Sequence, residues 1–303
     1  MNYIQANTNG RLHSATDPVL SPLDRGFLYG DAVYEVWRTY HDTVFAFDEH
    51  WTRLEASAKS LHLTLPFDAA EAWRELTRTV AAFRAHGGES SELYIRLQVS
   101  RGGGLIGLDP ALADHPTWVF LVQSLPPVSE EKMQAGLRTV IAADIRRNHP
   151  ATLNPLWKTG NYLNNLLALR EAKAAGADEV VLLNLAGEIT EASTMNIAFV
   201  RDGRVVMPPL SAGILGGITR RKFLSDVAPR AGVETSEAAV LPADLDRMEE
   251  AFFLSTTKDI TPIASIGEHL FRVGPGTLSI RLKNAFADFV REDATAHPER
   301  FLG

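Results

Sequence analysis

Short turn sequences between apolar segments restrict the possible folds of this chain most, because each turn predicts that the two strands beside it form a hairpin. NTNG at 7–10 lies between NYIQAN and RLHSA, His41-Asp42 lies between AVYEVWRTY and TVFAF, and Asp202-Gly203 lies between MNIAFVR and RVVMPP. Gly, Asn and Asp are the residues that tight hairpin turns favour. Because hairpins outnumber helical crossovers, we expect an α+β fold and not a doubly wound parallel sheet.

Helical patterns are interleaved with these strands. Trp51, Leu54, Ala58 and Leu61 recur at helical spacing, which predicts a helix with Asp48 as its cap. Further helices are predicted at about 68–86, 161–175, 219–232 and 277–292.

A polar, proline-led segment suggests where the chain divides. PPVSEEKMQAG at 126–136 is the best linker candidate. The sequence therefore predicts a small N-terminal α+β domain at 1–125 and a large C-terminal domain at 137–303.

Composition excludes several classes of protein. The chain has 303 residues, a formal net charge of −7 and no cluster of basic residues, so we expect no nucleic-acid partner. Uncharged runs shorter than about 18 residues predict no membrane span, and no signal peptide is visible. The absence of cysteine excludes disulfides and thiolate chemistry and fits a cytoplasmic protein. Scattered histidines predict no metal site.

Two glycine-rich stretches differ in what they predict. RGGGLIG at 101–107 has the glycine spacing of a dinucleotide-binding turn, but prolines follow and no helix opens there, so we expect a loop. In SAGILGGITRRKF, Gly213, Gly216 and Gly217 precede Thr219 and a helix. Free N–H groups at the positive end of a helix suit an anion, especially a phosphate; an ordinary helix entry is the alternative.

Lys158 is the candidate for covalent chemistry. It stands between Trp157 and a Thr-Gly pair, just before a helical pattern. An amine attacks a carbonyl only as the free base, which partial desolvation favours, and Trp157 could supply that environment. A solvated surface lysine is the alternative.

Several blocks of the sequence together resemble one family. KTGNYLNNLLALREAKAAGADEVVLLNLAGEITEASTMNIAFV, LGGITRRKF and FFLSTTKDITPI look like the signature blocks of fold-type IV (class IV) aminotransferases, which use pyridoxal 5′-phosphate (PLP), and the likeness spans about 21–290. It implies a two-domain α+β enzyme, with a small α/β domain and a larger, coenzyme-binding pseudo-barrel α/β domain. It also implies a homodimer in which Leu105–Asp109 could contribute to the neighbour's site.

The resemblance assigns roles to residues of this chain. It implies that Lys158 forms a Schiff base with the coenzyme and later moves a proton, and that Glu191 pairs with the pyridine nitrogen, which makes the ring an electron sink. Tyr162 would meet the phenolic oxygen and Leu215 the ring. The phosphate ligands implied are Arg53, Ile218, Thr219 and Thr256.

The substrate motifs point in more than one direction. Tyr94 and Arg96 in ELYIRLQVS resemble the carboxylate-binding pair of branched-chain aminotransferases, whereas Val36 after the glutamate of YEV resembles D-amino-acid aminotransferases. The loop lacks the Arg-x-His trap of the latter, and Ser255–Thr257 with Lys258 departs from the Gly-Thr-Ala of the former. The candidate substrate residues are Tyr29, Tyr34, Arg38, Tyr94, Arg96 and Thr257.

We therefore expect a transaminase that moves an amino group between an apolar or branched-chain L-amino acid and 2-oxoglutarate. A D-amino-acid aminotransferase and an aminodeoxychorismate lyase on the same fold are the alternatives.

Overall fold

A computed structural model describes residues 3–88, 92–113 and 115–303, and the chain forms two compact units. Unit 1 comprises Met1–Pro126, Trp157–Asn161 and Arg291–Gly303, and unit 2 comprises Pro127–Leu156 and Tyr162–Val290.

The domain boundaries at 1–125 and 137–303 stay a prediction. The compact units differ from them because 157–161 and 291–303 belong to unit 1. The proposed linker, 126–136, contains a helix, α4 (Glu130–Ala135), whose N-cap Ser129 accepts a hydrogen bond from Lys132 N–H.

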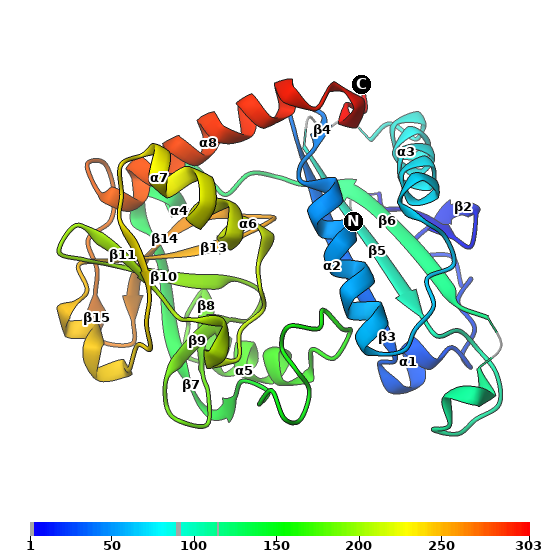
Figure 1. The fold of residues 1–303 in the computed structure, drawn as a ribbon, viewed down its shortest axis with the longest axis horizontal. Coiled ribbons are helices and arrows are strands. Elements are labelled where there is room, and N and C mark those ends of the chain that lie inside the picture. The colour runs from blue at the N-terminus through cyan, green and yellow to red at the C-terminus, as the bar shows by residue number, and fades with distance from the viewer. Residues whose placement is uncertain (1–2, 89–91, 114) are drawn as a thin grey trace. The chain divides into compact units, whose positions relative to one another are not determined.

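Unit 1 is built on a six-stranded antiparallel sheet with the order β2-β1-β6-β5-β3-β4 (Figure 1). The strands are β1 (Gln5–Thr8), β2 (Arg11–Ser14), β3 (Ala32–Tyr40), β4 (Thr43–Val44), β5 (Leu93–Ser100) and β6 (Thr117–Ser124), and the helices are α1 (Arg25–Tyr29), α2 (Phe47–Ser60) and α3 (Ala69–Ala85). Successive side chains of a strand face opposite sides of the sheet. One side is therefore apolar, and α2 and α3 cover it with Leu54 and Leu76, which are both fully buried.

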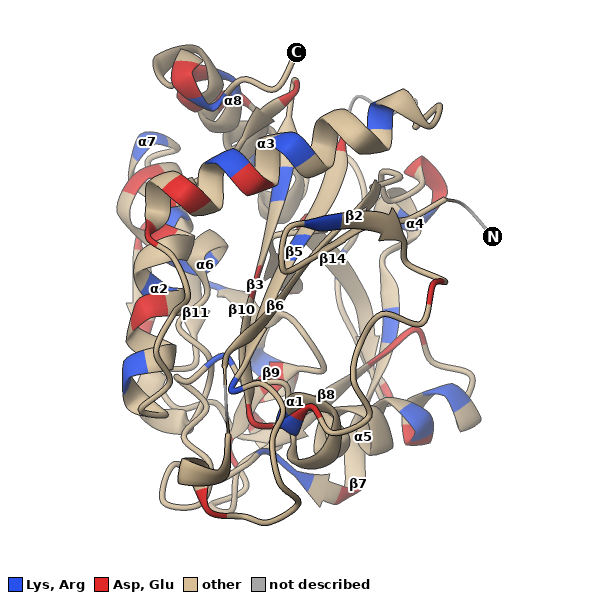
Figure 2. Cartoon of the chain, turned by 90° about the vertical axis from the view of Figure 1, so that its right-hand side faces the viewer, with Lys and Arg blue, Asp and Glu red and all other residues tan. Residues whose placement is uncertain are grey.

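Basic and acidic residues alternate along α3, as the blue and red segments of its ribbon show (Figure 2). Glu71 pairs with Arg74 at 3.2 Å, and Glu75 pairs with Arg78 at 2.7 Å. This alternation is typical of a solvated helix surface.

The three predicted hairpins are confirmed. Each turn uses backbone with positive φ, which Gly, Asn and Asp tolerate best. The turn residues are Asn9 (50°), Gly10 (87°), His41 (51°), Asp42 (60°), Asp202 (52°) and Gly203 (71°).

The prediction that Asp48 caps α2 is wrong. The helix begins at Phe47, and its N-cap is Ala46, which has a φ of 52° and no side-chain capping bond. Phe47 is 2% exposed, and its ring stacks on Trp37 with centroids 5.5 Å apart. Burial of Phe47 therefore sets where the helix begins, and Asp48 lies in the first turn.

The C-terminal residues of unit 1 pack beside the start of α2. Arg300 Nη2 donates to both carboxylate oxygens of Asp48 at 2.7 and 2.9 Å, and its guanidinium lies 4.6 Å from the Phe47 ring centroid. Leu302 N–H donates to Asp42 O at 3.0 Å. These contacts tie the end of the chain to the turn and helix that follow β3.

Unit 2 is built on a nine-stranded sheet, six of whose strands close into a ring. The order β12-β11-β10-β13-β14-β7-β8-β9 returns to β10 through the antiparallel pair Asn196–Glu191. The strands are β7 (Leu137–Arg146), β8 (Glu179–Leu183), β9 (Ile189–Ala192), β10 (Asn196–Arg201), β11 (Arg204–Met207), β12 (Thr235–Glu237), β13 (Glu250–Ser255), β14 (Asp259–Ile266) and β15 (His269–Leu270).

All six strands of the ring contribute apolar side chains to one core. Val181, Ile197, Phe199, Phe253 and Ile263 are members of it, and each is 0–1% exposed. Alternate residues of β8 point the other way and pack against helix α5 (Leu163–Ala174). The ring is the pseudo-barrel that the family resemblance implies.

The remaining helices of unit 2 follow the sequence pattern in part. The predicted helix at 219–232 is present as α6 (Ile218–Lys222), a π-helical turn (Phe223–Val227) and α7 (Ala228–Arg230). The closing helix is α8 (Leu278–Ala296), whose residues up to Val290 belong to unit 2. Across the described part of the chain, no helix combines the length and apolarity needed to cross a bilayer.

Candidate active site

The backbone of Lys158 is fixed against the edge of β3 in unit 1. Tyr34 N–H donates to Lys158 O at 3.0 Å, and Gly160 N–H donates to Ala32 O at 3.1 Å. On the other side, Lys158 N–H donates to the buried Ser57 hydroxyl of α2 at 3.1 Å. The position of this lysine is thus set by bonds that do not involve its side chain.

The Lys158 side chain is half-buried and points to Tyr34. Its Nζ donates to the Tyr34 hydroxyl at 3.2 Å and lies 4.4 Å from the ring centroid. The guanidinium of Arg96 lies 3.9 Å from the same centroid. Two cations therefore contact one aromatic ring that is only 5% exposed. The structure brings together three of the residues that the sequence singled out.

Strand register puts four predicted substrate residues on one face of the sheet. Directly opposed residues of an antiparallel pair share a face. Arg38 lies opposite Tyr94, and Val36 lies opposite Arg96. Tyr34 is two residues from Val36 and therefore faces the same side.

Arg38 is nevertheless engaged at the far end of β3. Its guanidinium lies 4.0 Å from the Tyr40 ring centroid, Nη2 is 3.8 Å from Glu92 Oε2, and Nε donates to Thr39 O at 3.1 Å. Arg38 is 8% exposed, so these contacts hold it within unit 1.

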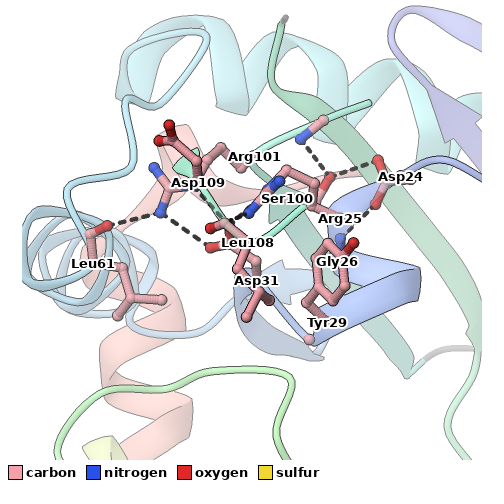
Figure 3. A network of polar contacts seen from close by, with 12 residues as sticks. Asp24, Arg25, Gly26, Tyr29, Asp31, Leu61, Ser100, Arg101, Leu108 and Asp109 are labelled. Carbon is pink, nitrogen blue, oxygen red and sulfur yellow. Dashed lines mark hydrogen bonds and ion pairs between the residues drawn. The ribbon is translucent and has the colours of Figure 1, made fainter. Parts of the chain in front are cut away.

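Tyr29 lies in a separate polar network that joins α1 to the glycine-rich loop (Figure 3). Its hydroxyl accepts a hydrogen bond from Gly107 N–H at 3.2 Å, and the Arg25 guanidinium lies 5.1 Å from its ring centroid. Arg25 is 3% exposed and donates to Gly107 O at 2.7 Å and to Leu108 O at 3.0 Å.

This network fixes the loop and leaves its apolar side chains outside. Asp31 accepts hydrogen bonds from Arg25 Nε at 3.3 Å and Arg101 Nε at 2.7 Å (Figure 3). Leu105, Ile106 and Leu108 are 74%, 76% and 77% exposed. A 3₁₀ turn, and no α-helix, follows at Pro110–Leu112, so the prediction of a loop is confirmed.

A buried polar cluster lies on the apolar side of the sheet in unit 1. Glu35 is 0% exposed and accepts hydrogen bonds from Arg53 Nε at 2.6 Å, Arg53 Nη2 at 2.8 Å and His50 Nδ1 at 2.7 Å. Burial alone raises the pKa of Glu35, but the charges and hydrogen bonds of Arg53 and His50 outweigh burial and hold that pKa well below its usual range.

His50 is neutral at neutral pH. Burial lowers the pKa of its imidazole, and the positive charges of Arg53 and Lys158 act in the same direction, against the opposing effect of Glu35. Because an ionised carboxylate only accepts hydrogen bonds, the proton of the neutral ring is on Nδ1.

In unit 2, Glu191 lies where the ring of strands closes. It is 5% exposed, and its Oε1 accepts a hydrogen bond from Arg147 Nε at 2.7 Å. Oε2 accepts from Asn196 Nδ2 at 3.0 Å and from Leu215 N–H at 3.1 Å. These three donors fix the orientation of the carboxylate.

The glycine-rich stretch of unit 2 leads into α6. Its N-cap is Gly217, with no side-chain capping bond, and Ile218 and Thr219 form the first turn, where N–H groups have no acceptor within the helix. A Cβ at Gly217 would lie 2.1 Å from Asn196 Oδ1. Position 217 therefore cannot carry a side chain unless Asn196, which donates to Glu191, moves.

The other candidate residues of unit 2 lie at element ends. Tyr162 is half-buried at the N-cap of α5. Thr256 and Thr257 are half-buried in the turn that joins β13 to β14. Among the described residues, no cluster of three or more His, Asp or Glu side chains is arranged to hold a metal ion.

Sequence reasoning missed several residues that support these groups. Arg147 and Asn196 hold Glu191, and nothing in their local pattern connects them to it. His50 and Ser57, which were also missed, are a better case, since their i, i+3, i+7 spacing with the predicted Arg53 puts all three on one face of α2. A polar stripe on the apolar face of a helix was the available signal.

The chain matches known proteins over most of its length. Residues 32–266 match the family model described as Amino-transferase class IV. A Methanocaldococcus jannaschii protein provisionally named as a branched-chain-amino-acid aminotransferase is 35% identical over 92% of this chain and 94% of its own length. The D-alanine aminotransferase of Bacillus licheniformis is 31% identical over 93% and 95%. The branched-chain amino acid aminotransferase of Thermobaculum terrenum, solved in its PLP form, has a TM-score of 0.79 at 25% identity and covers 99% and 97%.

The chain therefore belongs to the class IV aminotransferases. It is a PLP-dependent transaminase of fold type IV, as its sequence blocks implied. The polar groups of the chain suit this coenzyme: a half-buried primary amine suits its aldehyde, a fixed carboxylate suits its ring nitrogen, and an uncapped helix entrance that excludes side chains suits its phosphate.

The buried cluster predicts that acid destabilises unit 1. Below the ordinary imidazole pKa of about 6.5 the unfolded chain gains a proton that buried His50 does not, so the free energy of unfolding should fall by up to about 1.4 kcal/mol per pH unit. Glu35 should lower the free energy of unfolding further once the pH falls below the ordinary carboxyl pKa, about 4.3. Urea unfolding followed by tryptophan fluorescence checks this, because all five tryptophans belong to unit 1.

His50→Leu should remove the part of the slope that begins as the pH falls below about 6.5. The exposed His297→Asn should keep it. An unfolding free energy of the unsubstituted protein that is flat from neutral pH down to about pH 5 contradicts this assignment.

Proposed function

We propose that this chain transfers an amino group between an apolar or branched-chain L-amino acid and 2-oxoglutarate, with Lys158 as the residue that bonds to the coenzyme. The observation that carries the proposal is the setting of Lys158, whose backbone is pinned at the edge of β3 while its Nζ points to the Tyr34 hydroxyl. A lysine held in this way presents one amine at a fixed place, which covalent catalysis requires.

PLP, when bound, supplies an aldehyde that takes up amino groups and a protonated ring that withdraws electrons from the α-carbon. Lys158 would hold the coenzyme through Nζ at its aldehyde, and the same amine, when free, would carry the proton of the substrate α-carbon. The Tyr34 hydroxyl would position that amine, since it accepts a hydrogen bond from Nζ at 3.2 Å.

Glu191 keeps the ring nitrogen protonated in this proposal. Its carboxylate is oriented by Arg147, Asn196 and Leu215 N–H, so it does not need to reorganise as charge develops. Arg53, Ile218, Thr219 and Thr256 would bind the phosphate, and Leu215 and Tyr162 would contact the ring and its phenolic oxygen.

The sheet face of unit 1 supports an α-amino acid with an apolar side chain as the donor. Arg96 and Tyr94 supply hydrogen-bond donors for a carboxylate, and Val36 lies opposite Arg96 as an apolar surface. The M. jannaschii relative favours a branched-chain donor, and the B. licheniformis relative keeps the D-amino-acid alternative open. The loop after β5 carries no Arg-x-His pair, which favours the L-amino acids.

Borohydride reduction tests the covalent role. Reduction of the holoenzyme followed by peptide mapping should label Lys158, and Lys158→Ala should lower kcat by at least about 10²–10⁴-fold, the share of proton transfer alone. The variant should fold, because its backbone bonds to Tyr34 and Ser57 remain. Lys59→Ala, an exposed change in the same unit, is the control and should turn over normally. A label on any other lysine refutes the assignment.

A panel of amino donors tests the substrate. L-leucine, L-isoleucine and L-valine should bleach the visible band of the holoenzyme, and 2-oxoglutarate should restore it, because the carboxylate site is expected to accept L-amino acids. Each half-reaction is followed by absorbance. A preference for D-alanine makes the protein a D-amino-acid aminotransferase, and pyruvate release from aminodeoxychorismate without a keto acid makes it a lyase.

We also propose that the protein is a homodimer that buries the loop Leu105–Asp109 against a second copy. The loop is fixed by Arg25 and Tyr29, yet it exposes three large apolar side chains. Apolar surface that is held rigid loses little conformational entropy on association, and it contributes about 25 cal/mol per Å² buried.

Sedimentation velocity at micromolar concentration checks the dimer. The unsubstituted protein should sediment as a dimer, and Ile106→Asp should shift it toward monomer because a charge would be buried at the contact. Leu270→Asp is the matched control, since Leu270 is 82% exposed on β15 and is not part of the loop. A monomeric unsubstituted protein, or a dimer unaffected by Ile106→Asp, contradicts the proposal.

A further inference from the structure

Helix α2 carries a polar stripe inside the apolar core of unit 1. His50 and Ser57 are each 1% exposed, and Arg53 lies between them on the same face, which packs against β3 (Figure 1). Their neighbours on the helix, Trp51, Leu54 and Ala58, belong to the apolar core. Polar groups at such depth are costly unless they are paired, so their arrangement requires an explanation.

The carboxylate of Glu35 accepts two hydrogen bonds from one edge of the Arg53 guanidinium. Arg53 Nε donates to Oε1 at 2.6 Å, and Nη2 donates to Oε2 at 2.8 Å. Two parallel bonds to a planar group fix both its position and its plane. By the geometry of the guanidinium fork, the edge formed by Nη1 and the second Nη2 proton is then directed away from Glu35.

His50 fixes the carboxylate in turn. Its Nδ1 donates to Glu35 Oε2 at 2.7 Å, while its Nε2 is buried without a hydrogen-bond partner among the described residues. A buried acceptor without a partner destabilises a fold. The position of the imidazole therefore serves the hydrogen bond from Nδ1 to Glu35, although it leaves Nε2 without a partner and so lowers stability.

Stability alone does not account for this cluster. A buried ion pair contributes little net stability compared with well-packed apolar residues of similar size. The exposure is also uneven, because the Arg53 side chain retains 13% exposure and Glu35 has none. The arginine is the member that reaches the surface, and the other two lie behind it.

We infer that Glu35 and His50 are positioning residues that hold Arg53 in the orientation that binds the phosphate of the coenzyme. The inference rests on the proposed function, because it takes Arg53 as a phosphate ligand. Neither residue is assigned a contact with substrate or coenzyme. Their effect is confined to the phosphate, so it should be visible in how strongly the protein discriminates PLP from pyridoxal, which lacks the phosphate.

The test measures the dissociation constants of PLP and of pyridoxal for the full chain freed of coenzyme, and compares their ratio among variants. His50→Leu removes the Nδ1 donor and should lower the preference for PLP by about tenfold, the usual effect of losing one hydrogen bond to a charged group. Glu35→Gln should lower it by at least as much. Pyridoxal affinity should stay unchanged in both.

A conservative variant separates positioning from simple packing. His50→Asn puts an amide N–H at the place of Nδ1 and lacks the Nε2 atom, so it should retain the preference for PLP. Thr79→Val is the control for general destabilisation, because Thr79 is a fully buried polar residue of α3 that hydrogen-bonds Asn7 at 3.0 Å. It should leave the ratio unchanged.

Arg53→Lys distinguishes failure of this inference from failure of the proposed function. If Arg53→Lys leaves the ratio unchanged, Arg53 is not a phosphate ligand and the positioning role fails with it, whereas the role of Lys158 is decided by borohydride labelling. If Arg53→Lys lowers the ratio while His50→Leu and Glu35→Gln do not, the phosphate role stands and the positioning role is refuted. Equal losses of PLP and pyridoxal affinity in the His50 and Glu35 variants also refute it, since they indicate a purely structural role.

Discussion

The edge of β3 is the constraint on which the candidate site of unit 1 depends. Two backbone hydrogen bonds, Tyr34 N–H to Lys158 O and Gly160 N–H to Ala32 O, join a distant segment of the chain to this strand. The pleat of the same strand then sends Tyr34 to one side and Glu35 to the other. One strand thereby supplies the partner of the lysine amine, the buried partner of Arg53 and the anchor for the lysine backbone.

In unit 2, the orientation of Glu191 depends on the closure of the sheet. Glu191 and Asn196 form the pair that closes the ring of strands, and the same two residues are joined by their side chains at 3.0 Å. Asn196 Nδ2 also donates to Leu215 O at 3.0 Å, beside the glycine-rich entrance to α6. Closure of the sheet, orientation of the carboxylate and shape of the helix entrance are therefore coupled through one asparagine.

Sequence patterns predicted the fold well where the determinant is local. Asp202-Gly203 specified its hairpin because few residues accept positive φ. The helix predicted from about residue 68 begins at Ala69, and Asp68 is its N-cap. The start of α2 was missed because burial of Phe47, a tertiary effect, overrode the capping signal of Asp48. The site was predictable to the extent that the family motifs name residues such as Lys158. The partners Arg147 and Glu35 were not, because they lie 44 and 18 positions away in the sequence from the residues they hold, and only folding brings them into contact.

The docking of the C-terminal segment has a consequence for how the protein is handled. Arg300 and Leu302 brace the turn after β3 and the uncapped start of α2, the helix that carries His50, Arg53 and Ser57. Residues at the end of a chain are commonly trimmed or fused to affinity tags as if they were inert. Here the loss of residues 300–302 would remove these contacts from the start of α2, and so would affect the helix that anchors the Lys158 backbone through Ser57.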